Sequence, residues 1–404
     1  MSRIMAELRA GTWLTYDRIK LYIGVLLIFE MVMLAFFAAG THGLIVPLAG
    51  PNTTDFVSFY AAGRLANAGN APAAYDHLAH HLMEQIVTQP GIAYNYFFYP
   101  PPFLLICGLL ARLPYLPAFY AFQAVTILLY LLAIKPILPN ARTWQILAFP
   151  AAFWTFGMGQ NAFLTASLLA AATWSVDRRP WRAGLLFGSL CYKPHIGLLI
   201  PLALAAGRHK RAFAAAAAAV IGWITLSLWM FGWQTWEAFF LATAGAQTVY
   251  GAKAIDMAGL ASPYGATLVL GGSFALACGV QICVSSGVGA LVALAWRCRV
   301  SLPARAAALI AGTPLAVPVL LFYDLMLDGL ALAWLIRAGQ QAGFPPWHRS
   351  GLGLLFLMPL LSGNLDSESK LLIAPLTAAL GFALAASRVL HERRQARSAI
   401  SASV

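Results

Sequence analysis

Several polar residues lie where the chain leaves long apolar stretches, and their side chains could do chemistry. Asp55 opens the helix-like run DFVSFYAAGRLANAG, where its carboxylate could cap the helix or act as a general base. Arg64 follows nine residues later, about half a turn out of phase at 3.6 residues per turn. The two side chains are therefore not expected to share a helix face. Arg64 could meet another cavity wall or a lipid headgroup, or extend from the interface into water.

Lys193 and Asp324 stand in otherwise apolar sequence, where a charged side chain needs a partner or water. Pro194 interrupts the helix after Lys193 and frees backbone groups that can line a polar pocket. The Lys193 ammonium could bind a phosphate or extend to the nearest surface. Asp324 follows Tyr323 in a short polar turn, where it could bind sugar hydroxyls or cap the next helix.

Gln160 and Asn161 form a third polar turn, GQN, which could line a cavity or merely satisfy turn backbone. His77, His80 and His81 have an i, i+3, i+4 spacing that can hold a metal, although histidines in an exposed loop helix usually bind none. The chain has no DxD motif, P-loop or GxSxG, and its five cysteines include no CxxC pair. We therefore expect no metal, no cofactor and no disulfide.

These residues have to be positioned by membrane helices. The chain has 404 residues, of which 60% are hydrophobic and 10% charged, and its apolar residues come in blocks long enough to cross a bilayer. The blocks are rich in Leu and Ala without strand-like alternation, which predicts an all-α polytopic membrane protein with ten to twelve transmembrane helices in one domain, 1–404. The expected spans are 21–39, one passage within 100–135, 143–157, 161–176, 183–193, 195–207, 212–231, 275–296, 304–321, 325–337, 351–363 and 371–388.

The net charge of +12 gathers in clusters between the apolar blocks, as the positive-inside rule predicts for cytoplasmic loops. This distribution speaks against nucleic-acid binding. It predicts both termini inside, a basic cytoplasmic tail at 389–404 and a helical first external loop at 40–99. The other external turns would be 159–161, 193–195, 232–274, 323–324 and 364–370. Polar turns on one side indicate a single external-facing cavity.

Glu30, in the first span, is expected to form an interhelical hydrogen bond while protonated.

The order of these pieces resembles glycosyltransferase family 87, a branch of the GT-C superfamily. The resemblance is carried by DFVSFYAAGRLANAG with YD at 75–76, YPPPFLL at 99–105, GQNAFLTASLLAAA at 159–172, the stretch from Arg179 to Arg211 that contains YKPH, and TPLAVPVLLFYDLML at 313–327. It implies a GT-C fold, a polyprenyl-phosphate mannose donor, inverting transfer on the extracytoplasmic face without a metal, and Asp55 as general base. Some members carry a histidine before the late turn, where this chain has Phe322 and Tyr323.

The resemblance predicts transfer of a hexose, mannose by analogy, from a lipid phosphate to a glycolipid or glycan acceptor in a bacterial inner membrane. Asp55 would take the acceptor proton, and Lys193, with Arg64, would stabilise the departing phosphate. A polytopic transporter or lipid flippase stays open as an alternative, as does a surface-polysaccharide polymerase or ligase. The residues expected to bind substrate are Tyr60, Arg64, Gln160, Asn161, Lys193, His195, Tyr323 and Asp324.

Overall fold

The computed structural model describes residues 3–41, 45–46, 52–251, 257–298, 300–363 and 371–401. The described chain is helical apart from an antiparallel pair of two-residue strands, β1 (Ile45–Val46) and β2 (Asn52–Thr53). The α-helices are α1 (Arg3–Ala10), α2 (Tyr16–Ala39), α3 (Phe56–Asn67), α4 (His77–Val87), α5 (Pro102–Leu110), α6 (Tyr115–Ile134), α7 (Thr143–Leu147), α8 (Pro150–Gly157), α9 (Ala162–Ser175), α10 (Pro180–Gly188), α11 (Ile200–Ala206), α12 (Lys210–Gly251), α13 (Pro263–Val269), α14 (Phe274–Arg297), α15 (Leu302–Ala316), α16 (Met326–Ala342), α17 (His348–Leu357) and α18 (Ile373–Ser401). The 3₁₀ turns are η1 (Ala71–Tyr75), η2 (Ser189–Tyr192), η3 (Pro194–Gly197), η4 (Met257–Gly259), η5 (Phe322–Leu325) and η6 (Met358–Leu361).

Five helices in the described ranges are long and apolar enough to cross a membrane: α2, α6, α12, α14 and α18. The chain is therefore an all-helical, multi-pass membrane protein, as the sequence predicts. Most other predicted spans form shorter helices, because prolines and polar turns divide them. The block 143–157 becomes α7 and α8, separated before Pro150, and the block 195–207 becomes η3 and α11. The ten to twelve crossings and the GT-C fold stay predictions.

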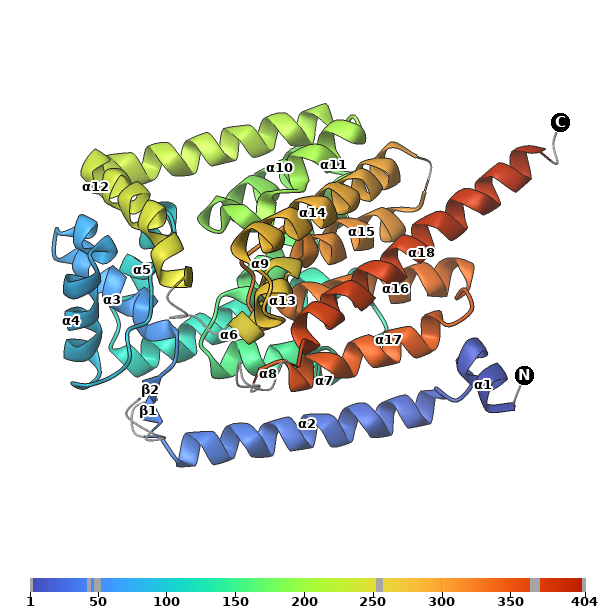
Figure 1. Ribbon diagram of the computed structural model, residues 1–404, viewed down its shortest axis with the longest axis horizontal. Coiled ribbons are helices and arrows are strands. Elements are labelled where there is room, and N and C mark those ends of the chain that lie inside the picture. The colour runs from blue at the N-terminus through green and yellow to red at the C-terminus, as the bar shows by residue number, and fades with distance from the viewer. Residues whose placement is uncertain are drawn as a thin grey trace.

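The predicted external stretch 232–274 is largely helical rather than a loop. Helix α12 continues past the expected end at residue 231, with a kink at Gly232, whose φ of 75° favours glycine. In Figure 1 the second part of α12 turns back toward α5 at the end of the molecule where α3 and α4 lie. The predicted stretch therefore begins with a kink at one glycine and continues through the rest of α12, η4 and α13. The predicted turn at 364–370 lies outside the described residues.

The predicted external loop 40–99 carries α3, η1 and α4, which confirms its helical character. These elements gather at one end of the molecule, whereas α1 and the C-terminal part of α18 lie at the other (Figure 1). Helix α3 is buried on most sides, and Phe56 and Phe59 contact the aromatic rings of Phe103, Phe119 and Phe122. This aromatic packing fixes α3 against α5 and α6.

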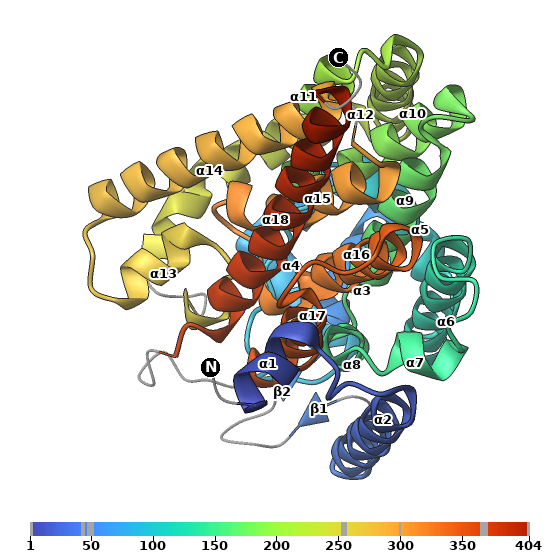
Figure 2. The same ribbon diagram turned by 90° about the vertical axis from the view of Figure 1, so that its right-hand side faces the viewer.

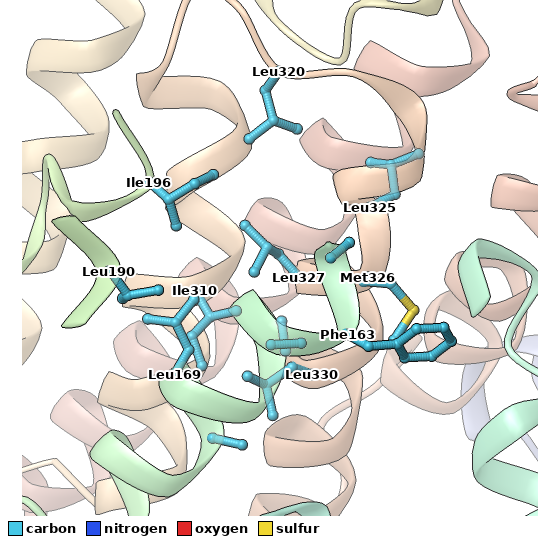
Figure 3. Close-up of a cluster of buried hydrophobic side chains, with 14 of the residues drawn as sticks. Phe163, Leu169, Leu190, Ile196, Ile310, Leu320, Leu325, Met326, Leu327 and Leu330 are labelled. Atoms are coloured by element: carbon cyan, nitrogen blue, oxygen red, sulfur yellow. The ribbon is translucent and has the colours of Figure 1, made fainter. Parts of the chain in front are cut away.

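The core of the bundle is formed by α9, α15 and α16, whose residues are mostly buried. Figure 3 shows part of this core, to which the interrupted helices also contribute. Its labelled side chains are Phe163, Leu169, Leu190, Ile196, Ile310, Leu320, Leu325, Met326, Leu327 and Leu330. In contrast, α2 lies at the edge of the bundle (Figure 2), where its chief contacts are with α7 and α8.

Two glycines bring α10 against α12. Gly184 and Gly188 form a GxxxG spacing, and a Cβ at either position would overlap a carbonyl oxygen of α12, at Ala212 or Ala216. Small residues at this spacing let two membrane helices approach closely, so that backbone packing holds them together. Glycine is therefore required here by the short distance between the helices.

We expect Gly188→Leu to destabilise the protein, because overpacking costs about 1–3 kcal/mol and the neighbouring α12 backbone cannot move aside easily. Thermal unfolding of the purified protein in detergent would measure the loss. Gly222→Leu is the matched control, since a Cβ at Gly222 of α12 meets no atom within 4 Å. Equal unfolding temperatures for the two variants would contradict the close-contact role of Gly188.

Candidate active site

Asp55 stands immediately before α3, in the position of an N-cap, but its side chain makes no capping hydrogen bond. Instead, its Oδ2 accepts a hydrogen bond of 2.7 Å from Nε2 of Gln160. Burial raises the pKa of Asp55 to about 6, although the Gln160 hydrogen bond and the Lys193 charge oppose this. The carboxylate is only half-buried, so a ligand can reach it. The sequence left open whether Asp55 caps α3 or acts as a general base, and the structure shows no capping hydrogen bond.

Gln160 belongs to the GQN turn between α8 and α9, which fits closely against α3 and α6. Gly159 has a φ of 69°, and a Cβ there would collide with Phe56 and Phe119. The Gln160 Oε1 accepts from the Tyr99 hydroxyl at 3.3 Å, and this fixes the amide so that Nε2 faces Asp55. Tyr99 and Gln160 therefore orient the carboxylate from one side.

Lys193 and Asp324 form a buried ion pair. The Lys193 Nζ donates to both carboxylate oxygens, at 2.6 and 2.8 Å, and the residues are only 4% and 3% exposed. Nζ also donates to Oδ1 of Asn161 at 3.3 Å and lies 5.6 Å from the ring centroid of Tyr323. The lysine sits between η2 and η3, where Pro194 breaks the helix, and the aspartate sits in η5.

The Asp55–Gln160 hydrogen bond and the Lys193–Asp324 ion pair belong to one site, because Gln160 and Asn161 are adjacent in the chain. Asp55, from the first external loop, and the Lys193–Asp324 pair, from later turns, are joined through this dipeptide. Asn161 is fully buried, and its Nδ2 has no hydrogen-bond partner in the part of the chain that the structure describes. A buried donor in this state can be satisfied by a ligand oxygen or by water. The site thus combines a reachable carboxylate, a cation and an available amide.

The other predicted site residues lie differently. The Tyr60 hydroxyl donates to the Leu113 carbonyl oxygen at 2.8 Å, which fastens α3 to the start of α6. Arg64 is exposed near the end of α3, consistent with its phase relative to Asp55. His195 is exposed in η3, two residues beyond the ion pair. Among the described residues, no hydrogen bond or ion pair joins these three to the Asp55–Lys193 network, and His195 interacts with Lys193 only through its charge.

Two network residues were missed by the sequence reasoning. Tyr99 precedes the triple proline that opens α5, a visible signal that was assigned no role. Gln123 is a buried amide in the apolar helix α6, and its Nε2 donates to the Gln160 carbonyl oxygen at 3.4 Å. A polar residue at such a depth is itself a signal, because it must satisfy its hydrogen bonds inside the protein.

Two of the three histidines of α4 support the fold of the external loop. The ring nitrogens Nε2 of His80 and His81 donate to the carbonyl oxygens of Ser58 and Ile92, at 3.1 and 3.0 Å. No group of three or more His, Cys, Asp or Glu side chains in the described ranges is arranged to hold a metal ion. The backbone contacts account for two of these imidazoles.

Glu84 lies fully buried beside His80 and joins two parts of the external loop. Its Oε2 accepts from the Asn95 backbone N–H at 3.2 Å, and its Oε1 lies 3.8 Å from Nδ1 of His80. Burial raises the pKa of Glu84 to about 8 and lowers that of His80 to about 4. At neutral pH both side chains are therefore favoured in their uncharged forms.

The buried Glu84 makes the stability of this loop depend on pH. Between its ordinary pKa of 4.5 and its folded value of about 8, the folded side chain keeps a proton that the unfolded one has lost. Stability should therefore fall as pH rises through this window. Hydrogen exchange of residues 77–99, normalised for the intrinsic pH effect, should show weaker protection at pH 8 than at pH 6.5. Glu84→Gln should abolish this loss.

The matched control is Glu237→Gln, at an exposed carboxylate of α12, which should leave the pH dependence of residues 77–99 unchanged. Equal protection of the wild type at both pH values would show that Glu84 is not held protonated.

The sequence model of glycosyltransferase family 87 matches residues 97–323, more than half of the chain. The matched region includes Tyr99, the GQN turn, Lys193 and Tyr323, whereas Asp55 precedes it and Asp324 follows it directly. No curated protein and no solved structure matches the chain. On the extent of the match, together with its membrane-spanning helices, this chain belongs to glycosyltransferase family 87 and is a membrane glycosyltransferase.

Proposed function

We propose that this glycosyltransferase moves a hexose, mannose in our proposal, from a polyprenyl-phosphate donor to an acceptor hydroxyl, with inversion at the anomeric carbon. The observation that carries the proposal is the Asp55 carboxylate, held by Gln160 and linked through Asn161 to the buried Lys193. The acceptor is a glycolipid or a glycan. The active site faces the outside of a bacterial inner membrane, because Asp55 belongs to the first external loop of the predicted topology.

Asp55 acts as the general base. Its Oδ2 is engaged by Gln160, and Oδ1 accepts no hydrogen bond from the described residues. Oδ1 can therefore take the proton of the acceptor hydroxyl while that oxygen attacks the anomeric carbon. The bond from this carbon to the phosphate oxygen breaks on the opposite face, and polyprenyl phosphate leaves. A single displacement of this kind inverts the anomeric configuration.

Lys193 supplies the positive charge for the phosphate. A lipid phosphate is already a competent leaving group, so the protein needs a cation near the oxygen on which negative charge develops. Asp324 holds the ammonium in place with two hydrogen bonds, and Asn161 adds a third. The phosphate would share Lys193 with Asp324. In this proposal the reaction needs no metal or cofactor, since the ammonium takes the role that DxD-bound ions have for nucleotide-sugar donors.

An apolar cavity supports a lipid-linked donor. It has a volume of about 850 Å³ and lies between the first half of α2 and the helices α6, α16 and α17. Its lining includes Phe149 and residues of α16 from Gly329, five positions beyond Asp324, to Gln340. We assign part of the polyprenyl chain to this cavity. A transporter or flippase could also bind a lipid, but family membership favours the transferase.

The first test is sugar transfer by the purified enzyme in nanodiscs, from radiolabelled polyprenyl-phosphate mannose into a total lipid extract. Asp55→Asn should lower turnover by about 10²–10⁴-fold, because an amide cannot accept the proton.

With the pKa of Asp55 raised to about 6, wild-type kcat/KM should fall about tenfold per pH unit below that value, as the base becomes protonated.

Asp76→Asn is the control, since this nearby carboxylate caps α4 and asparagine can cap in the same way. It should retain activity. Turnover of Asp55→Asn at the wild-type rate would refute the assignment of Asp55 as base.

A second test concerns the lipid cavity. Ile23→Trp adds bulk to the cavity wall on α2 and should raise KM about tenfold for a long-chain polyprenyl donor, since overpacking costs about 1–3 kcal/mol. A short-chain donor that does not reach Ile23 should keep its KM. Ile28→Trp, on the same helix but outside the cavity and 66% exposed, is the control. Unchanged KM values for both chain lengths would exclude this cavity as the chain site.

A further inference from the structure

The segment 92–99, between α4 and α5, carries a set of aromatic side chains that the proposed reaction does not use. Tyr94, Tyr96 and Phe98 alternate along it and are half-buried, whereas Phe97 between them is buried against the core. His77, the first residue of α4, lies beside them and is exposed. We call His77, Tyr94, Tyr96 and Phe98 the aromatic stripe.

The rings of the aromatic stripe are closely ordered. The imidazole of His77 and the rings of Tyr96 and Phe98 are almost parallel, with interplanar angles of 2° and 5° and centroids 6.0 and 5.4 Å apart. Tyr94 meets His77 and Tyr96 edge to face, at 4.2 and 4.5 Å. Such contacts stabilise each ring against rotation, so the stripe is a preformed surface.

Hydrogen bonds to neighbouring helices hold the backbone beneath the stripe. The Asn95 N–H donates to the buried Glu84, and the Ser58 hydroxyl of α3 donates to the Tyr96 carbonyl oxygen at 3.3 Å. His81 anchors the start of the segment at the Ile92 carbonyl oxygen. A segment without regular secondary structure is thus fixed at three points. A binding surface held in this way loses little conformational freedom when a ligand arrives.

The segment leads directly to the proposed base. At its end, the Tyr99 hydroxyl donates to Gln160, which in turn donates to Asp55. Ser58, which holds Tyr96, lies one helical turn after Asp55 on α3. The stripe therefore belongs to the same segment of the external loop as Tyr99, the residue that orients Gln160 and, through it, Asp55.

The charges around the stripe identify the class of ligand. Residues 76–99 contain no lysine or arginine, and of their two carboxylates Glu84 is buried, which leaves Asp76 exposed. The Tyr94 and Tyr96 hydroxyls have no hydrogen-bond partner within the described ranges. Within residues 76–99, a phosphate or an anionic headgroup would find no cation to pair with. Flat apolar rings with hydroxyl and imidazole groups at their edges suit a neutral ligand that has C–H faces and many hydroxyls.

We propose that the aromatic stripe is the acceptor subsite and that it binds the sugar units of a carbohydrate acceptor adjacent to the one that is glycosylated. The inference rests on the proposed function for the identity of the reaction, but sugar binding can be tested without turnover. Pyranose C–H faces pack on the aromatic rings, and sugar hydroxyls bond to the phenolic groups of Tyr94 and Tyr96.

Saturation-transfer difference NMR, with the full chain in nanodiscs and manno- and gluco-oligosaccharides of two to four units as probes, tests the subsite. The wild type should bind at least one of these probes. The double variant Tyr94→Ala/Tyr96→Ala should weaken that binding by about tenfold or more, because it removes two of the rings on which the sugar packs. Tyr96→Phe, which keeps the ring, should retain more affinity than Tyr96→Ala.

Tyr120→Ala is the matched control: this tyrosine of α6 is 53% exposed and lies outside the stripe. It should bind as the wild type does, and hydrogen exchange of residues 77–99 should show that the double variant is folded. Absence of oligosaccharide binding by the wild type, or equal binding by the double variant, would overturn the proposal; the latter would leave the stripe as an anchor at the membrane interface. Oligosaccharide binding without any sugar transfer would refute the proposed function alone.

Discussion

Lys193 and Asp324 carry opposite charges and lie buried together in an apolar bundle. The arrangement of the site depends on this ion pair. Removing one partner would leave the other as an uncompensated buried charge, a change that typically costs about 3–5 kcal/mol. The pair also joins two interruptions of the helical bundle, the break at Pro194 and the turn η5. Regular helices there would have satisfied their own backbone groups and left no polar turn to hold the pair.

The GQN turn transmits this arrangement to Asp55. Gly159 allows the turn to press against Phe56 and Phe119, and Gln160 and Asn161 then point to the two halves of the site. Burial raises the pKa of the Asp55 carboxyl, while its one hydrogen bond, from Gln160, lowers it and leaves Oδ1 open to a ligand. Its environment therefore suits a base better than that of a carboxylate exposed to water.

The sequence predicted the elements of this site better than their connections. Charged and amide residues in apolar sequence are costly, so Asp55, Gln160, Asn161, Lys193 and Asp324 were each visible from sequence. The contact between Lys193 and Asp324, which are 131 positions apart, depends on how α9, α15 and α16 pack. No local sequence pattern predicts it. Likewise, the length of α2 follows from its uninterrupted apolar run, whereas the helical continuation of α12 beyond Gly232 depends on a single backbone conformation.

The peripheral position of α2 affects how a substrate travels. Only 11% of its most apolar window is buried within the protein, and the cavity lined by its first half lies between α2 and the rest of the bundle. Each methylene moved from lipid into water costs about 0.8 kcal/mol, so the isoprenoid chain of the proposed donor would stay in the bilayer if it entered this cavity from the side. The enzyme would then meet its donor by diffusion in two dimensions and its acceptor at the external surface. The supply of the donor would then depend on its density in the membrane leaflet, whereas the supply of the acceptor would depend on its concentration at the external surface.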